Sequence, residues 1–384
     1  MHTKNFSFQK SITLAICALM LFLVLFASAI TAPSASAARP ATKTPTPTGS
    51  SPTATPSASD PTPTPSGSDF GIASDKAYSW LKMQQDQYST GFVESFNITG
   101  QLANVCFTYD QAVAAIAFKA KGDSARAKLV LDRLQTLQMS SGSWYTAYNC
   151  STLQPWESNQ HVGPNLWVVL AAKYYGDSTY DAMAKKAIDW TLQFQQADGG
   201  VNGGLNADGS VITWCSTEHN QDAYAAYSKY GYTTQANNIK NFLVNQVWKT
   251  DHFWAGRNDS NDPLDVNPWG VSALGATTYG VSLDYALSTH RNVKNGIDAF
   301  DFDSDKDDIW FEGTGQMVVA FNVAGRTSDA NYFTNEIIKG QKSNGGVPYS
   351  LLGTNNGYWT MSKAESVSST GWLIFAIHNV NPFK

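Results

Sequence analysis

Charged side chains are scarce in this sequence of 384 residues, where they make up 15% of the chain against about 25% in an average soluble protein. The 31 Asp and Glu outnumber the 26 Lys and Arg, and several of the basic residues lie in the first 68 positions. The rest of the chain is therefore acidic and offers no basic surface for nucleic acid. A surface so poor in charge, in a chain with 12 Trp and 17 Tyr, favours contact with a neutral, polar ligand.

Only one apolar run is long enough to span a bilayer. It extends from Ile12 to Ile30, follows Lys4 and Lys10, and precedes the small residues at 35–37. This order is typical of a secretory signal peptide, so we predict a signal over 1–37 and a secreted or extracellular protein. If the signal is not cleaved, it would instead anchor the chain in a membrane. Residues 38–68 are rich in Pro, Thr and Ser and predict an extended linker, which leaves 69–384 as a folded domain without a membrane span.

Cysteine is also rare, with four residues in the whole chain. Cys106, Cys150 and Cys215 belong to the exported part, and an odd number leaves at least one thiol without an intramolecular partner. A Cys106–Cys150 disulfide is one open pairing. The Cys and His spacing does not match a zinc site, and neither a phosphate-binding Gly loop nor a Ser nucleophile elbow is present.

Helical periodicity interrupted by Gly-rich loops predicts six helical hairpins after residue 70. The expected helices cover 73–86, 108–121, 124–138, 163–175, 178–196, 218–230, 233–247, 266–279, 281–292, 312–325, 327–342 and 365–378. The second, fourth and later even members are small and apolar, whereas the odd members carry one charged face. We therefore expect the even helices to form an inner ring and the odd helices an outer ring.

Three of the hairpins turn tightly, with a glycine where the first helix ends. Gly122, Gly176 and Gly325 occupy these positions, and we expect Ser124, Ser178 and Thr327 to cap the helices that follow.

This pattern resembles the (α/α)6-barrel, or six-hairpin glycosidase-like, superfamily of carbohydrate-active enzymes. The resemblance implies an all-α toroid over 69–384 and a glycan substrate, although an open solenoid is the structural alternative. The same architecture hosts hydrolases, lyases, epimerases and terpene cyclases. The hairpin ends DRLQTLQMSSGSW, FQQADGGVNGG and IKGQKSNGGVPYS also resemble the Gln…Gly-x-Trp turns of squalene-cyclase-like toroids, which keeps a terpene-cyclase-like toroid open.

Acidic residues recur where the inner helices are expected to begin, and parallel inner helices would bring these starts to one end of the ring. These acids are Asp110, Glu218, Asp222, Asp265, Glu312 and Glu365. Acids are ordinary helix caps, so their convergence is the argument for function. We expect the positive end of each helix to favour the ionised carboxylate by about 0.3–1 kcal/mol.

Glycoside hydrolysis commonly needs one protonated carboxyl as acid and one carboxylate as base or nucleophile. We predict that Glu218 is the acid and that Asp110 or Glu312 is the base. Asp222, one helical turn after Glu218, is the local alternative. The sequence thus predicts a secreted glycoside hydrolase.

Aromatic and polar residues near the same helix starts are expected to bind the substrate, because indole faces suit the apolar faces of sugar rings. The expected binding residues are Tyr109, Trp156, His161, Trp214, His219, Asp265, Trp269, Trp310 and Trp359. A polysaccharide lyase would use Tyr109 or His219 to remove a proton, but it needs cations for the uronate, and Arg257 is the nearest candidate. A sugar epimerase would use paired histidines, and a non-catalytic glycan-binding protein would keep the Trp residues without needing the acids.

An acidic segment nearly matches the spacing of a calcium-binding loop. It contains Asp301, Asp303, Asp305 and Asp307, but Lys306 stands where such a loop needs glycine. Calcium is the only cofactor that the sequence suggests. We expect a monomer whose partner is a carbohydrate.

Overall fold

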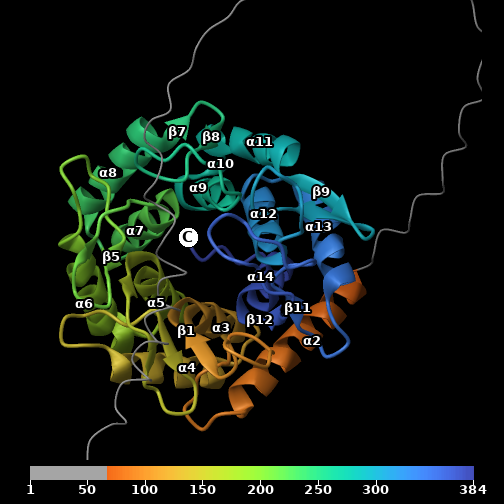
Figure 1. Ribbon diagram of the computed structural model, residues 1–384, viewed down its shortest axis with the longest axis horizontal. Coiled ribbons are helices and arrows are strands. Elements are labelled where there is room, and N and C mark those ends of the chain that lie inside the picture. Colours follow the sequence, from red (N-terminus) through yellow and green to blue (C-terminus); the bar gives the residue numbers. More distant parts are fainter. Residues whose placement is uncertain (1–66) are drawn as a thin grey trace, which may run out of the picture. The chain divides into compact units, whose positions relative to one another are not determined.

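The computed structural model describes residues 67–384, where six inner helices are wrapped by six outer ones (Figure 1). The predicted signal peptide and nearly all of the predicted linker lie outside the described residues. The inner helices are α3 (Thr108–Ala120), α5 (Val162–Tyr175), α7 (Thr217–Lys229), α9 (Val266–Leu274), α12 (Phe311–Val323) and α14 (Val367–His378). The outer helices are α2 (Gly67–Asp86), α4 (Ser124–Leu137), α6 (Asp181–Leu192), α8 (Thr233–Phe242), α11 (Val281–Thr289) and α13 (Thr327–Gly340).

The inner helices form a closed ring. Each packs against the next in chain order, and α14 packs back against α3 as well as against α12. This closure confirms the predicted (α/α)6 toroid and excludes the open solenoid for the described part of the chain. No helix within residues 67–384 is both long enough and apolar enough to cross a membrane.

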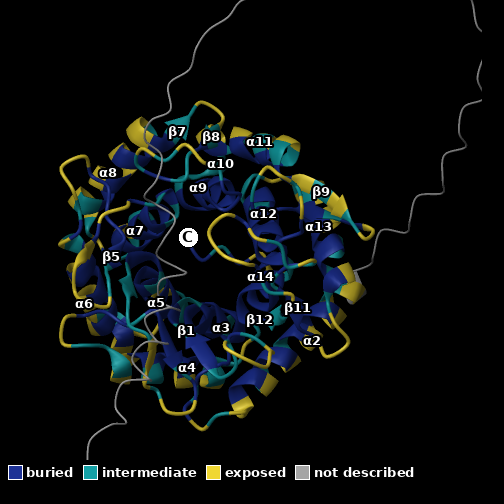
Figure 2. Ribbon diagram, viewed as in Figure 1, coloured by how far each residue is buried: buried dark blue, intermediate teal, exposed yellow. Residues whose placement is uncertain are grey.

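Burial follows the predicted division between the two rings, as Figure 2 shows. The inner helices are buried nearly all round, and the VVLAA stretch of α5 illustrates why, since apolar side chains point in every direction. The outer helix α4 instead buries Ala127, Val130, Leu131 and Leu134 and turns Lys128 and its other charged residues outward. This one-sided burial is what a helix packed on one face requires.

A glutamine turn at the end of three outer helices docks each onto the next outer helix. Gln138, Gln195 and Gln341 each donate from Nε2 to the carbonyl of the glycine four residues later and to a backbone carbonyl on or beside the following outer helix. The third turn reaches from the end of α13 to Ala73 of α2, at 2.9 Å, and so joins the last outer helix to the first.

The glycines of these turns allow very close backbone approach. Gly142, Gly199 and Gly345 have φ of 109°, 95° and 99°. A Cβ on Gly345 would lie 2.1 Å from the carbonyl oxygen of Lys76 in α2, and the other two positions are equally crowded. Only glycine fits such a turn.

In two of the three tight hairpins, the side chain that caps the second helix lies one residue before the predicted position. Gly122, Gly176 and Gly325 have positive φ, as expected. The capping side chains are Asp123, which accepts from the backbone N–H of Arg126, and Asp177, which accepts from that of Thr179. Ser124 and Ser178 are thus not caps but the first helical residues, and the helix beginning at Thr327 has no side-chain cap.

Short strands and irregular turns, which the sequence did not predict, shape the loops between helices. The single-turn pieces are η1 (Ser178–Tyr180), the π-helical η2 (Leu243–Val247) and α10 (Ala276–Tyr279). The strands are β1 (Val105–Phe107), β2 (Ala147–Asn149), β3 (Pro155–Glu157), β4 (Gln160–His161), β5 (Gly204–Leu205), β6 (Val211–Ile212), β7 (Trp248–Lys249), β8 (His252–Phe253), β9 (Arg291–Lys294), β10 (Ile297–Phe300), β11 (Val347–Pro348) and β12 (Glu365–Ser366). All strand pairs are antiparallel, so these strands stiffen the loops without forming a layer of their own.

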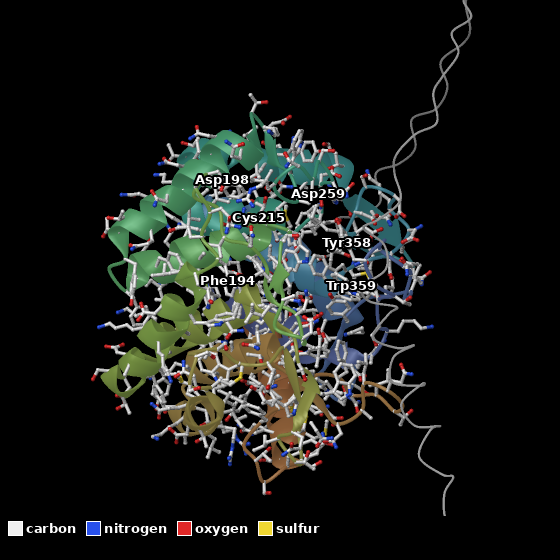
Figure 3. All side chains as sticks on the ribbon, turned by 60° about the vertical axis from the view of Figure 1, so that its left-hand side comes forward. Phe194, Asp198, Cys215, Asp259, Tyr358 and Trp359 are labelled. Carbon is white, nitrogen blue, oxygen red and sulfur yellow. A yellow bond between two sulfur atoms is a disulfide. The ribbon has the colours of Figure 1, made fainter. Side chains whose placement is uncertain are left out.

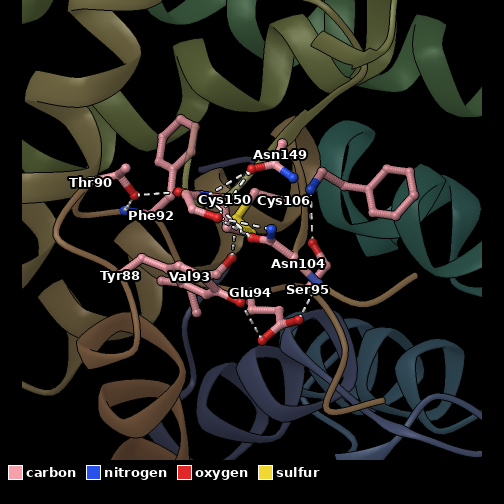
Figure 4. Close-up of a disulfide and its surroundings, with 12 residues drawn as sticks. Tyr88, Thr90, Phe92, Val93, Glu94, Ser95, Asn104, Cys106, Asn149 and Cys150 are labelled. Carbon is pink, nitrogen blue, oxygen red and sulfur yellow. Dashed lines mark hydrogen bonds between the residues drawn. A yellow bond between two sulfur atoms is a disulfide. The ribbon is translucent and has the colours of Figure 1, made fainter. Parts of the chain in front are cut away.

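A disulfide joins Cys106 in β1 to Cys150 after β2 (Figure 4). The pairing left open by the sequence is therefore present, and Cys215 is a buried free thiol. The bridge closes a sequence separation of 44 residues, a length for which loop-closure entropy stabilises a fold by roughly 4 kcal/mol. Beside it, Thr90 donates to the carbonyl of Cys150 at 2.7 Å, which ties the segment after α2 to the same place.

Aromatic side chains close the middle of the ring. Trp167 of α5 lies 5.4 Å from Trp269 of α9 and 5.8 Å from Trp372 of α14, measured between ring centroids. Phe383, near the C-terminus, packs against both Trp167 and Trp269. Figure 1 shows the C-terminus at the centre of the ring. The ring is therefore a packed core and not a pore.

We predict that Gly345→Ala lowers the free energy of unfolding by about 3 kcal/mol or more. An alanine in this left-handed conformation costs about 1–2 kcal/mol. Its Cβ would also push α2 away, which costs further packing energy. Gly325→Ala is the matched control, because Gly325 has a φ of 72° but no atom within 4 Å of its added Cβ. Urea unfolding of both variants tests this prediction, and equal losses would contradict the docking role of the turn.

Candidate active site

Four carboxylates lie at the starts of four inner helices. Asp110, Glu218 and Glu312 lie in the first turns of α3, α7 and α12, and Asp265 is the residue before α9. Their charges affect one another across the ring: Glu312 raises the pKa of Asp110, and both Asp265 and Glu312 raise that of Glu218. The predicted convergence of helix starts is thus present, and we call these four acids the carboxylate cluster.

Glu218 is partly exposed yet enclosed by the ring. Burial is the main cause that raises its pKa well above the usual range, followed by the negative charges of Asp265 and Glu312. The carboxyl group therefore keeps its proton to a higher pH than a free glutamic acid does. A protonated carboxyl that a ligand can reach is what a general acid requires.

Glu312 has the most elaborate surroundings of the four. Its Oε1 accepts a hydrogen bond from the Tyr109 hydroxyl at 2.6 Å and another from Gln316 Nε2 at 3.3 Å. The Tyr109 hydroxyl in turn accepts from the indole of Trp372 at 2.8 Å, so the aromatic floor of the ring orients it. Burial raises the pKa of Glu312 to about 7, while the hydrogen bonds from Tyr109 and Ser368 hold it lower than burial alone would. Glu312 is thus poised to exist as a carboxylate near neutral pH.

Asp110 and Asp265 complete the cluster. Burial raises the pKa of Asp110 to about 8, and the nearby charge of Glu312 adds to the effect of burial. Burial also raises the pKa of Asp265 to about 7, against an opposing hydrogen bond from the backbone of Val266. Desolvation therefore outweighs the effect of about 0.3–1 kcal/mol by which each helix end is expected to favour the ionised carboxylate.

Asp222 lies deeper than the cluster. Its side chain is fully buried, and the indole of Trp167 is the neighbouring group whose hydrogen bonding lowers its pKa. Burial and the charge of Glu218 raise its pKa well above the usual range. Asp222 thus lies below the position where a ligand could touch it.

Two histidines and a tryptophan lie beside Glu218. The ring centroid of His219 is 5.2 Å from that of Trp214 and 6.5 Å from that of His161. Burial lowers the pKa of His161 to about 4 and that of His219 to about 3, so both imidazoles are neutral at neutral pH. Gly163 makes room for His219, since a Cβ there would lie 2.2 Å from the imidazole ring.

The expected tryptophans divide into exposed and buried groups. Trp156 and Trp214 are 42% and 45% exposed, and Trp359 is 36% exposed. Trp269 belongs to the aromatic floor, and Trp310 is covered by Phe302 and Tyr349. Trp269 and Trp310 are thus buried and present no free indole face.

Tyr349, which the sequence analysis did not select, lies among the carboxylates. Burial and the charges of Glu312, Asp265 and Asp110 raise the pKa of its phenol well above the usual range. Tyr349 follows the two-residue strand β11 and does not begin an inner helix. Because Tyr349 lies outside the helix starts, the sequence pattern does not point to it.

Arg257, the cation nearest to the entry loops in the sequence, is already paired. Its Nε and Nη2 each donate to Asp198 at 2.6 Å, and its Nη1 donates to Asn202 at 2.9 Å. This two-pronged ion pair satisfies the guanidinium. The carboxylate cluster therefore has no cationic partner in this arginine.

The acidic segment brings three of its four expected ligands together. Oxygen atoms of Asp301, Asp303 and Asp305 lie within 4.8 Å of one another, and Lys306 adopts the left-handed conformation expected of the missing glycine, with φ 59°. Oxygen ligands of this kind suit Ca²⁺. Asp307 instead accepts from the Thr354 hydroxyl, and Asp301 and Asp303 already accept backbone N–H groups.

A separate surface cavity of about 590 Å³ lies outside the ring, between α2 and α4. It contains none of the residues of the carboxylate cluster. The cavity is therefore separate from the candidate active site.

Comparison with solved structures shows the same toroid in sugar-processing proteins. A glycosidase variant solved in complex with glucose superposes with a TM-score of 0.65 at 12% identity, over 82% of this chain and 97% of that one. A D-mannose isomerase gives the same values, and an alpha-amylase from Clostridium perfringens gives a TM-score of 0.62 at 8% identity over 83% of this chain and 99% of that one. No family model and no curated protein sequence matches the chain. These similarities establish a six-hairpin glycosidase-like fold.

The carboxylate cluster predicts that stability falls as pH rises. Acids whose folded pKa is raised bind more protons in the native than in the unfolded state, so unfolding becomes easier above their unfolded pKa of about 4 and up to about 8. Asp110→Asn removes one such acid. Between pH 5 and pH 8, the free energy of unfolding of the variant should therefore fall less steeply with pH, by up to about 1.4 kcal/mol per pH unit. Urea unfolding across this range measures the slope, and an unchanged slope in the variant would show that Asp110 is ionised in the fold.

Proposed function

We propose that this chain is a secreted glycoside hydrolase that cleaves a neutral glycan, with Glu218 as the general acid and Glu312 as the carboxylate base or nucleophile. The observation that carries the proposal is that a partly exposed Glu218, whose pKa is raised well above its usual range, shares the carboxylate cluster with Glu312, whose pKa is about 7. Hydrolysis of a glycosidic bond needs these two protonation states in one site. The solved structures that share the fold include a glycosidase with glucose and an alpha-amylase, which supports the same reaction class.

Each residue takes a role that its surroundings support. Glu218 donates its proton to the leaving oxygen of the glycosidic bond. Glu312, with Oε1 occupied by Tyr109 and Gln316, uses its remaining oxygen either to take a proton from water or to attack the sugar carbon. Trp214 and Trp156 offer exposed rings to the faces of sugar units.

Charge argues against anionic substrates. The carboxylate cluster offers a uronate no cation, and Arg257 is engaged by Asp198. A lyase needs a cation to stabilise the carboxylate of its substrate when the neighbouring proton is removed. Neutral sugars avoid this requirement, so they are the favoured class.

Sugar isomerisation is the second candidate, and the histidine pair favours it. His161 and His219 are neighbouring neutral imidazoles, which can accept and return a proton on a bound sugar. A D-mannose isomerase shares the fold. Incubation with free aldoses distinguishes the two, because an isomerase forms a ketose without cleaving any bond.

Glu218→Gln should lower kcat on a neutral glycan by about 10²–10⁴-fold, the usual contribution of a general acid, while oligosaccharide binding is retained. Glu365→Gln is the matched control. Glu365 also lies near an inner-helix start, but it is bound to Asn97 at 2.9 Å and should tolerate the change. Reducing-end release and calorimetric binding test both variants, and an active Glu218→Gln would remove the assignment.

Tyr109→Phe should shift the pH profile upward. Loss of this donor removes the stabilisation of the ionised form of Glu312, so the pKa of Glu312 rises above about 7 and the acidic limb of kcat/KM moves to higher pH. Activity should recover as the pH is raised. If activity falls by the same factor at every pH, Tyr109 acts only through packing.

A further inference from the structure

Two exposed aromatic rings lie on the loop between β11 and β12. Tyr358 is 49% exposed and Trp359 is 36% exposed, and Figure 3 shows them next to each other. Both rings contact Phe302, with centroid distances of 5.9 and 5.4 Å. The rings are thus held on a firm base while their outer faces stay open to solvent.

A single buried carboxylate anchors this loop. Asp308 is fully buried, and its two oxygens accept backbone N–H groups from four consecutive residues, Leu351, Leu352, Gly353 and Thr354, at 2.7–3.1 Å. Hydrogen bonds to a charged acceptor are roughly twice as strong as neutral ones. Asp308 therefore fixes where the loop leaves the ring.

The turn that follows presents the two rings together. Asn356 Oδ1 accepts from the backbone N–H of Tyr358 at 3.0 Å and from that of Trp359 at 2.9 Å. Gly353 and Gly357 adopt positive φ of 79° and 84°, which only glycine adopts freely. Several residues of this loop therefore hold the two rings in place.

The loop borders the carboxylate cluster. The backbone N–H of Leu264, the residue before Asp265, donates to the carbonyl of Phe302 at 2.8 Å, so the base of the rings is bonded to the segment that carries Asp265. Asn261, in the loop that leads to α9, donates to the Tyr358 hydroxyl at 3.4 Å. The negative charge of Asp265 contributes to a raised pKa of Tyr358, after burial and the charge of Asp259. In Figure 2 an exposed loop reaches toward the centre of the ring between α12 and α14.

We propose that Tyr358 and Trp359 form a subsite for a sugar unit next to the one that is cleaved, and that Asp308 is its positioning residue. The substrate is then a neutral oligosaccharide or polysaccharide chain and not a single glycoside. This inference rests on the proposed function for the chemistry, but the binding it requires is independent of turnover. Open aromatic faces suit the apolar faces of neutral sugar rings.

Chain-length dependence tests the subsite. In the full-length chain, Trp359→Ala should lower kcat/KM about tenfold, or ~1.4 kcal/mol, on neutral glucose- and mannose-based oligosaccharides, mainly through KM. The same variant should leave kcat/KM on aryl monosaccharides unchanged. Asp308→Asn should act in the same direction, since one oxygen becomes an NH₂ group facing backbone donors. Tyr332→Ala, which removes a comparably exposed ring from the outer helix α13, is the control and should change neither value.

Calorimetry separates the subsite from the reaction. In the Glu218→Gln background, affinity should rise from monosaccharide to oligosaccharide, and Trp359→Ala should abolish that rise. If Asp308→Asn fails to fold, Trp359→Ala and Tyr358→Ala still decide the matter. An equal loss on short and long substrates, or an affinity that is independent of chain length, would overturn the subsite. If the unaltered chain cleaves no neutral glycan but still shows length-dependent binding that needs Trp359, the proposed hydrolysis fails and the subsite stands.

Discussion

Closure of the ring is the constraint on which the rest of the structure depends. The Gln341 turn joins the last outer helix to α2, and α14 packs against α3. Only a closed ring brings the starts of α3, α7, α9 and α12 to one place. The carboxylate cluster exists because of this closure, since Asp110 and Glu312 are 202 positions apart in the sequence and no local motif unites the four acids.

Enclosure by the ring also decides the charge state of the cluster. A helix N-terminus favours an ionised carboxylate by about 0.3–1 kcal/mol. Burial instead moves the pKa of Asp110 from 3.8 to about 8, an effect of roughly 6 kcal/mol at 1.36 kcal/mol per unit. Desolvation therefore outweighs the helix field several times over. An acid that would be an ordinary cap on an isolated helix becomes a proton donor inside the toroid.

Much of the fold could be predicted because helical periodicity and glycine turns are local signals. The apolar stretch of α5 and the charged face of α4 already separate the inner from the outer ring. The caps at Asp123 and Asp177 were displaced by one residue, since neighbouring Asp and Ser are equally good caps. The short strands could not be predicted, because two to four residues are too few to show a periodic pattern.

The candidate site could be predicted only in part, because the sequence indicates where helices begin but not how deeply each side chain is buried. Nothing in the sequence distinguishes exposed Trp214 from buried Trp269, because both lie near an inner-helix start. Tyr349, Asp308 and Tyr358 act through loops whose positions depend on contacts with distant segments, such as the bonds from Asp308 to residues 351–354. The pairing of Arg257 with Asp198 across 59 positions is equally invisible in the sequence.

The most direct test of the account is the identity of the products formed from neutral and uronate-containing polysaccharides in ¹⁸O-labelled water. Hydrolysis predicts shorter neutral chains that carry one ¹⁸O atom at each new reducing end and no unsaturated sugar. Unsaturated products from uronates alone, or ketoses formed from free aldoses without cleavage of any chain, would contradict the assignment of Glu218 and Glu312 as a hydrolytic pair.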